Sequence, residues 1–437
     1  MGFSARFRRR SRAAAARPFR TERTLPSNHM VFLLLDLVLI AVAARLLGKL
    51  AERLGQPAVI GEIAAGIIAG PTILGAHLSG IVFPQDVRSY LSAFANVGVM
   101  IFMFLAGLEI DRGSFNGNRR AVATVSLSAY FVPFALGCGV ALLVLSRYHQ
   151  DNRLTFALFI GCALAVTAFP VLARILIERD LMGTRIGQLS MASAAIDDIL
   201  AWIVLAFVIG LARPGAGDQW RLLLFVPLVP AMWWLVRPLL VRASRSTAAT
   251  NDNRMIFLAV CGALVFGAAT EWIGLHLIFG AFLFGVIFPR THRPVVETGA
   301  QLLSSVFLPA FFVIAGLQVD LSSLDRAGVA EMIAILVTAL AGKLGGTYFA
   351  ARANGIEPRE AGALASLMNT RGLTELIILN VGLTTGLIGV QLYSILVVMA
   401  LVTTAMTSPL LRQLGVTPEL GRLPIRATEP QMVREQS

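Results

Sequence analysis

From Met30 onward, long apolar runs alternate with short polar links that carry arginine or turn-forming residues. Each run holds about 17 to 25 residues, the length that an α-helix needs to cross a lipid bilayer. Thirteen such runs follow one another, centred near Ile40, Gly66, Met100, Phe134, Ala165, Ile199, Leu228, Leu264, Phe282, Phe311, Leu340, Leu373 and Leu401. We therefore predict an all-α polytopic membrane protein with about 13 transmembrane helices.

The two ends of the chain do not follow this pattern. Residues 1–29 form a leader that is rich in Arg, Ala and Ser, contains one acid and lacks the apolar core of a secretory signal. We expect this leader to be disordered or not native, with Met30 as the biological start. Residues 30–414 should form the transmembrane domain, and residues 415–437 a short cytoplasmic tail.

Basic residues are distributed unevenly over the polar links. Alternate links hold 21 lysines and arginines on one side of the membrane and six on the other. Cytoplasmic links of membrane proteins carry the excess of positive charge. We therefore expect the C-terminus to lie in the cytoplasm, and we expect the membrane to be the bacterial inner membrane.

Two stretches of the first half of the chain recur in the second half. The matches are LAGLEIDRGSF at 105–115 with IAGLQVDLSSL at 314–324, and Gly61, Gly66 and Pro71 with Gly280, Gly285 and Pro289. Each match joins apolar runs that are seven runs apart, and an odd offset turns the second copy upside down in the membrane.

Inverted repeats of this kind are the architecture of secondary transporters, whose substrate site lies near the membrane midplane. We predict a first six-helix repeat over residues 30–212, a linker helix over 219–243, and a second six-helix repeat over 254–414. Chance similarity between glycine-rich apolar segments is the alternative explanation.

Helix-breaking residues interrupt the fifth and twelfth runs at corresponding places in the two repeats. The fifth run reads AVTAFPVLARIL, with Pro170 shortly after Thr167, and the twelfth reads MNTRGLTELIILN. The polar stretch of the twelfth run comprises Asn369, Thr370, Arg371 and Gly372. Unwound backbone at membrane depth is tolerated where it lines a cavity. We therefore predict two crossed discontinuous helices, with Thr167, Asn369 and Thr370 lining the site.

Composition supports this class of protein and excludes others. Hydrophobic residues make up 56% of the chain and charged residues 14%, with a mean hydropathy of +0.74. The formal net charge of +12 does not indicate nucleic-acid binding, because eight of the 37 basic residues lie in the leader and most others lie in the links. Cys138, Cys162 and Cys261 all lie inside apolar runs, so we expect no disulfide framework.

Two adjacent acids, Asp197 and Asp198, interrupt the sixth apolar run. An ionisable side chain near the centre of a membrane helix costs about 2.5 to 3.5 kcal/mol on insertion scales, which makes such a residue a candidate for function. Neighbouring side chains on a helix point about 100° apart, so the two carboxylates should have different roles. A pair that holds either protons or a monovalent cation is the functional interpretation, and two structural salt bridges are the alternative.

Three other charged residues lie within the predicted spans. Lys343 is one of two lysines in a chain with 35 arginines, and lysine can lose its proton when buried, whereas arginine effectively cannot. We interpret Lys343 as a counter-ion to one aspartate that is released when the cation binds, or else as a permanent structural partner. Arg371 and Glu375 are four residues apart, the spacing of an intrahelical ion pair, and we interpret them mainly as a structural pair.

Taken together, TAFPVLARIL, AAIDDILAW, the lysine of the eleventh run and NTRGLTELIILN resemble the monovalent cation/proton antiporter superfamily, most of all the cation/H+ exchanger group of plants, fungi and bacteria. The resemblance covers about residues 31 to 414. It implies an elevator mechanism in which runs 4–6 and 11–13 form a moving core, and runs 1–3 and 8–10 form a dimerising panel.

The resemblance also implies roles for individual residues. Asp198 would be the principal carrier of the cation and the proton, and Asp197 would pair with Lys343. Two acids at this motif tend to accompany electrogenic exchange in the family. About 23 residues follow Leu414, which is too few to form the nucleotide-binding regulatory domain of many relatives, so we expect no cofactor.

We therefore predict a transporter, a homodimeric antiporter of Na+ or K+ against H+, rather than an enzyme with catalytic residues. An ion-coupled organic-anion symporter of related fold would need unpaired positive charge at the two breaks. An intramembrane aspartyl protease has a Gly-x-Gly-Asp motif, which Gly215, Gly217 and Asp218 reproduce in an external link, but no Tyr-Asp pair occurs on the preceding run. A channel without proton countermovement is the fourth class considered.

Overall fold

The computed structural model describes residues 26–109, 119–148, 152–212, 224–245, 252–273, 277–322 and 324–416. Every regular element in these residues is a helix. The first half comprises α1 (Pro26–Arg53), α2 (Ala58–Ala69), α3 (Gly75–Val82), α4 (Gln85–Glu109), α5 (Arg119–Leu143), α6 (Arg153–Ala165), α7 (Phe169–Glu178) and α8 (Arg185–Ala212). The predicted leader up to residue 25, the tail from residue 417 and the motif at Asp218 lie outside the described residues.

The second half contains short helical segments as well as long ones. They are α10 (Phe225–Ala231), the π-helical η2 (Met232–Val236), α11 (Arg237–Arg245), α12 (Asp252–Ile273), α13 (Ile278–Ile287), the 3-10 turn η3 (Arg290–His292), α14 (Arg293–Leu317), α15 (Arg326–Leu340), the π-helical η4 (Ala341–Gly345), α16 (Gly346–Ala353), α17 (Pro358–Met368), α18 (Leu373–Thr384) and α19 (Val390–Gln413).

Nine helical stretches in the described part of the chain are long and apolar enough to cross a membrane. They are Met30–Arg53, Val87–Leu108, Arg119–Leu143, Arg185–Ala212, Val226–Ser244, Asp252–Ile273, Arg290–Leu317, Arg326–Ala353 and Val390–Gln413. The second, fifth, ninth and twelfth predicted runs instead contain shorter apolar helices, namely α2, α6, α13 and α18. The all-helical membrane fold is confirmed, whereas the count of thirteen spans stays a prediction.

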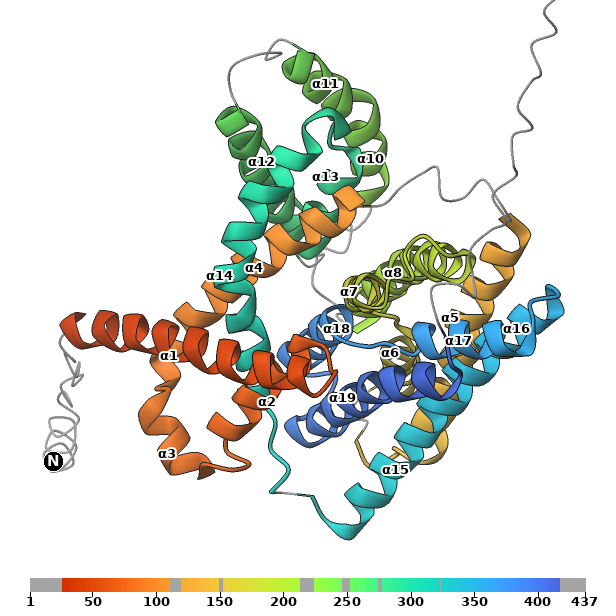
Figure 1. Ribbon diagram of the computed structural model, residues 1–437. Helices are drawn as coiled ribbons and strands as arrows, with labels where there is room; N and C mark the ends of the chain where they lie inside the picture. The colour runs from red at the N-terminus through yellow and green to blue at the C-terminus, as the bar shows by residue number, and fades with distance from the viewer. Residues whose placement is uncertain are drawn as a thin grey trace, which may run out of the picture.

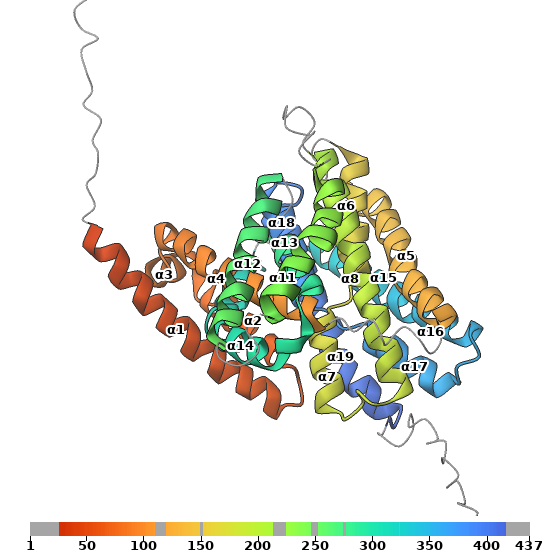
Figure 2. The same ribbon diagram turned by 90° about the horizontal axis from the view of Figure 1, so that it is seen from above.

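The helices pack into two groups, which are visible in both views of the molecule (Figures 1 and 2). We call α1–α4 and α12–α14 the panel, in which α4 packs along α14, α13 crosses α4, and α2 crosses α14. We call α5–α8 and α15–α19 the bundle, in which α5 packs against α6, α8 and α16. Helices α10 and α11 join the groups along the chain, and η2 packs on α13 of the panel. This grouping corresponds to the two sets of runs that the sequence resemblance implied.

Glycine allows the panel helices to touch backbone to backbone. A Cβ added to Gly66 of α2 would lie 2.1 Å from the carbonyl oxygen of Val313 on α14. In return, a Cβ added to Gly316 of α14 would lie 2.3 Å from the carbonyl oxygen of Ile63 on α2. Real Cβ atoms do not approach oxygen so closely, so this crossing needs glycine on both helices.

The crossing of α4 with α13 has the same reciprocal form. A Cβ on Gly107 of α4 would lie 2.2 Å from the carbonyl oxygen of Phe282, and a Cβ on Gly285 of α13 would lie 2.1 Å from that of Phe104. The sequence matches pair α4 with α14 and α2 with α13. A two-fold relation would therefore turn one crossing into the other, which supports the inverted repeats; the full repeat assignment stays a prediction.

Two helix breaks meet inside the bundle. The first separates α6 from α7 and the second separates α17 from α18. The backbone N–H of Ala168 donates a hydrogen bond to the carbonyl oxygen of Thr370 at 2.9 Å. The Thr167 hydroxyl donates to the carbonyl oxygen of Met368 at 3.0 Å. Backbone groups that the breaks leave without helical partners thus find partners in the opposite break, as burial requires.

The panel crossings generate a stability prediction. Gly66→Ala should lower the free energy of unfolding by about 1–3 kcal/mol, because the added methyl group overpacks a backbone contact. Gly139→Ala on α5 is the matched control, since a Cβ there meets no atom within 4 Å. Thermal unfolding of the detergent-solubilised protein would measure both variants. Equal unfolding midpoints for the two would contradict the crossing described here.

Candidate functional site

Two buried cations donate hydrogen bonds to the last backbone carbonyl groups of α6. Helix α6 ends at Ala165 because the chain unwinds there, and the last carbonyl groups of a helix have no intrahelical donor. Arg371 lies in the opposite break and donates to the carbonyl oxygens of Ala163 at 3.0 Å and Leu164 at 2.7 Å. Cations are favourable at a helix C-terminus, where the backbone dipoles leave partial negative charge.

Lys343 is the second buried cation, with a fully buried side chain. Its Nζ donates to the carbonyl oxygen of Ala165 and, at 2.9 Å, to that of Ala129 on α5. Ala129 needs a partner because Pro133, four residues later in the same helix, has no N–H to offer. The third donation goes to Asp197 Oδ2 at 2.8 Å. One ammonium group therefore donates to three acceptors: the last carbonyl group of α6, the carbonyl group that Pro133 leaves without a donor, and the carboxylate of Asp197.

A π-helical turn carries this lysine. Residues Ala341–Gly345 form five residues of π-helix between α15 and α16. A Cβ on Gly342 would lie 2.8 Å from the backbone of Pro133, so α5 passes very close to this turn. Single π-turns inside α-helices are frequent at functional sites because they change which side chains face inward. Here the turn and the close approach of α5 bring the lysine to the α6 break.

The two aspartates of α8 have different surroundings. Asp197 is fully buried, and its Oδ2 accepts hydrogen bonds from Lys343 and from the Thr167 hydroxyl at 2.9 Å. Asp198 is 2% exposed and turns toward the start of α18, where Thr374 lies next to its carboxyl group. Asp198 Oδ1 is buried and has no hydrogen-bond partner among the described residues. The two adjacent acids therefore differ in their hydrogen-bond partners.

The charges of the site do not cancel. Lys343 pairs with Asp197, and Arg371 Nη1 pairs with Glu375 Oε1 at 3.2 Å, with both side chains of the second pair fully buried. Among the described residues, Asp198 is the acid of this cluster that forms no ion pair. An isolated ionised carboxylate in an apolar interior is very costly, so Asp198 requires either a proton or a bound cation. The site can therefore bind a proton or a cation at Asp198.

The structure brings most of the predicted site residues together. Thr167, which was expected to line the site, contacts Asp197 directly. Arg371 and Glu375 form the predicted pair, although Arg371 lies in the break before α18 rather than on the helix itself. Asn369 donates from Nδ2 to the Thr403 carbonyl oxygen at 3.2 Å and keeps a buried Oδ1 without a partner in the described residues.

Three further threonines lie at the site: Thr370, which the sequence predicts, and Thr404 and Thr374, which it does not. The Thr370 hydroxyl donates back to the Leu367 carbonyl oxygen at 2.8 Å, so its side chain supports the end of α17. Thr404 Oγ1 accepts from the Arg371 N–H and donates to the Arg371 carbonyl oxygen, both at 2.9 Å. The available signal was the Thr403–Thr404 doublet, which lies in the run that the repeat pairs with the two aspartates. Thr374, next to Asp198, gave no sequence signal of its own.

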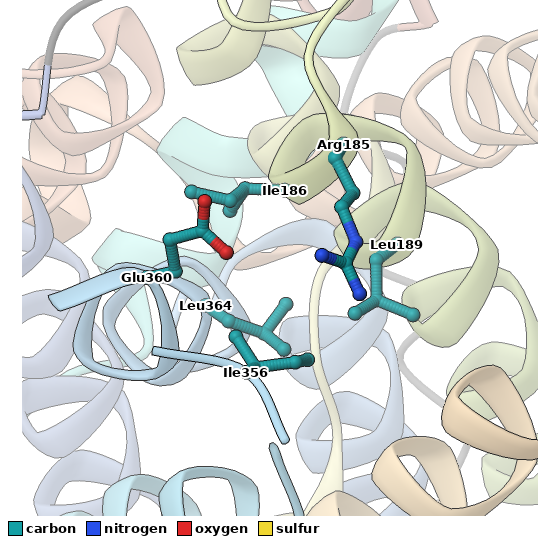
Figure 3. A pocket seen from close by; sticks show the side chains of 6 residues that line it. All are labelled: Arg185, Ile186, Leu189, Ile356, Glu360 and Leu364. Carbon is teal, nitrogen blue, oxygen red and sulfur yellow. The ribbon is translucent and has the colours of Figure 1, made fainter. Parts of the chain in front are cut away.

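A hollow at the N-terminal end of α8 lies within the bundle (Figure 3). The side chains of Arg185 and Glu360 stand on opposite sides of it. Its remaining lining is apolar and consists of Ile186, Leu189, Ile356 and Leu364, all buried. This lining offers no oxygen ligand below the rim, so we do not assign an ion site there. No group of three or more His, Cys, Asp or Glu in the described ranges could hold a metal ion.

Comparison with known proteins identifies the family. Residues 38–413 match the family described as sodium/hydrogen exchanger, transmembrane. The chain belongs to the sodium/hydrogen exchanger family. It is a multi-pass membrane transporter, and its family relatives are named antiporters.

Several named family members are similar to this chain. The Na(+)/H(+) antiporter NhaS4 of Synechocystis is 38% identical over 90% of this chain and 100% of its own length. The cation/H(+) antiporter 20 of Arabidopsis thaliana is 36% identical over 86% of this chain and 48% of its own length. The K(+)/H(+) antiporter 1 of Saccharomyces cerevisiae is 32% identical over 88% of this chain and 46% of its own length. The chain thus spans about half the length of these plant and yeast relatives.

A solved structure has the same fold. The sodium proton antiporter MjNhaP1 of Methanocaldococcus jannaschii superposes with a TM-score of 0.64 over 89% of this chain and 97% of that chain. The sequence identity is 14%, so the likeness concerns the fold.

The lysine contacts generate a second stability prediction. Lys343→Met should destabilise the protein by about 3–5 kcal/mol, because it leaves Asp197 as a buried carboxylate without its cation. Adding Asp197→Asn to this variant should recover part of the loss. Lys49→Met removes the other, exposed lysine and is the matched control. Thermal unfolding in detergent measures all three, and a Lys343→Met midpoint equal to that of Lys49→Met would contradict the described role.

Proposed function

We propose that this protein is a secondary active antiporter that exchanges Na+ or K+ for H+ across a membrane by alternating access. The observation that carries the proposal is the buried, unpaired carboxyl oxygen of Asp198 beside an Asp197 that Lys343 already neutralises. A carboxylate in that position is stable when it holds one proton or one monovalent cation. Occupancy by one therefore excludes the other, and this exclusion couples the two fluxes.

The names of the relatives support both candidate cations. The Synechocystis protein is named a Na(+)/H(+) antiporter, the yeast protein a K(+)/H(+) antiporter, and GerN of Bacillus cereus, 30% identical over 86% of this chain, a Na(+)/H(+)-K(+) antiporter. Vesicle assays with each cation in turn would decide the selectivity of this chain.

We call the boundary where the panel contacts the bundle the seam. Its contacts are compatible with a movement of one group past the other. Trp202 lies one turn after Asp198 on α8 and packs edge-on against Phe279 of the panel, with ring centroids 4.9 Å apart. This aromatic contact closes the seam beside the acid. In the proposed cycle the bundle carries Asp198 past the panel while its charge is neutralised, and the panel forms the homodimer interface. The C-terminus would lie in the cytoplasm of a bacterial cell.

An organic-anion symporter of related fold is disfavoured by the pairing of the buried cations. Lys343 is bonded to Asp197 and Arg371 to Glu375. In the described part of the bundle, neither cation is left to bind a substrate carboxylate.

The proposal predicts the effect of neutralising the carrier. Asp198→Asn should abolish cation-dependent dissipation of a pH gradient in proteoliposomes. The neutral amide does not take up a proton at these pH values and has no negative charge to attract a cation. Glu357→Gln, an exposed acid at the start of α17, should transport like the wild type. Wild-type exchange by Asp198→Asn would contradict the site assignment.

Competition at one carboxylate predicts a pH dependence. Protons should displace the cation, so the apparent KM for the cation should rise by up to about tenfold for each unit by which the pH falls, as for ligands that must be deprotonated to bind. Measurement between pH 6 and pH 9 with Na+, K+ and Li+ would test this. A KM that is constant over this range would refute competition.

A further inference from the structure

A second hollow opens between the panel and the bundle, away from the acids. It has a cavity volume of about 30 Å³ and lies near the C-terminal ends of α14 and α18. Four of its lining residues have neutral polar side chains: Ser92 and Asn96 on α4, Gln318 at the end of α14, and Asn380 on α18. The positive-inside distribution predicts that this end of the molecule faces outward. The hollow therefore lies on the expected external side of the seam.

The lining of this hollow combines apolar and neutral polar side chains. The apolar part consists of Ala95, Phe311, Ile314 and Ala315, each less than a tenth exposed. Gln318 Oε1 is buried and has no hydrogen-bond partner in the described residues. A buried amide oxygen without a partner is costly, and this cost would be relieved if the Gln318 amide turned into the hollow and met a cation or a water molecule there.

One short helix connects the hollow to the acidic site. Asn380 and Thr374 both belong to α18, and Thr374 lies next to Asp198. Six residues of α-helix span about 9 Å, so a cation in the hollow lies within roughly two helical turns of the carboxylate. Helix α18 also packs against α14 of the panel, which keeps the amides of both groups at one opening.

We infer that this hollow is a neutral selection site, where the transported monovalent cation exchanges part of its water shell for amide and hydroxyl oxygens before it reaches Asp198. The inference rests on the proposed antiport function. Neutral carbonyl-type oxygens can replace the hydration shell of a monovalent cation, and their number and flexibility favour one ion over another. None of the lining residues is charged, so the hollow binds weakly and releases the ion onward. Gln318 and Asn380 are its specificity-determining residues, one from each group.

The hollow at Arg185 and Glu360 lacks these properties (Figure 3). It lies between α8 and α17 within the bundle, so a movement of the bundle against the panel would not open or close it. Its rim places a guanidinium group opposite a carboxylate, and its floor is apolar. The two hollows thus differ in the oxygen ligands that cation selection requires.

The test replaces the amides and measures selectivity. Gln318→Leu and Asn380→Leu, assayed in proteoliposomes with Na+, K+ and Li+, should raise the apparent KM for the preferred cation at least fivefold and shift the ratios among the three cations. The maximal rate should stay within twofold of the wild type. Gln301→Leu, an exposed glutamine on the helix that Gln318 caps, is the matched control, and Asn380→Gln, which keeps an amide, should retain the selectivity of the wild type.

The outcomes separate this inference from the antiport proposal. Wild-type exchange together with unchanged KM values and ratios in both leucine variants would overturn the selection site and leave the antiporter intact. A wild-type protein without any exchange would overturn both.

A labelling experiment covers the case in which a leucine variant does not fold. Asn380→Cys should react with a membrane-impermeant thiol reagent above the wild-type background of the three native cysteines, and saturating Na+ or K+ should slow the reaction. Labelling at equal rates with and without cation would overturn the selection site.

Discussion

The structure depends on backbone carbonyl groups that lack a helical donor inside a membrane protein. The end of α6 exposes several of them, and Pro133 removes the donor for Ala129 on the neighbouring helix. Buried backbone carbonyl groups need hydrogen-bond donors, and here Lys343 and Arg371 supply them. Each cation then needs an anion, and Asp197 and Glu375 provide them.

This order of requirements explains why the proposed transport site contains so many charges. The ends of the broken helices carry partial negative charge, and Lys343 and Arg371 bind there. Asp197 and Glu375 then neutralise these two cations. Asp198 is the one acid of the cluster that these requirements do not explain, because its Oδ1 supports no other group in the described structure. In the proposed function this acid changes its occupant, and the paired residues around it would hold the site together while it does so.

The sequence predicts the positions of the helices and of both breaks, because run length and helix-breaking residues are local properties. It also predicts the Asp197–Lys343 pair through the resemblance to a known family. It does not predict that Lys343 binds the carbonyl oxygen of Ala129, since this contact depends on which helix passes the π-turn at close range. The positions of Thr374 and Thr404 likewise follow from packing between distant helices, and a single polar residue in an apolar run does not reveal its partner. The shortness of α2 was also not visible in the apolar pattern, which continues past the end of this helix, whereas the run that holds α13 is the shortest of the thirteen.

The glycine crossings of the panel have a mechanical consequence. Where two helices meet through side chains, rotamer changes let them slide or tilt by small amounts. Where they meet through backbone atoms, as at Gly66 and Gly316 or at Gly107 and Gly285, no soft layer lies between them, and a close-packed interior resists small deformations. The panel therefore behaves as one stiff plate. In the proposed transport cycle, displacement would be confined to the seam where the panel meets the bundle, and side chains that cross this seam, such as Trp202 and Phe279, would resist it.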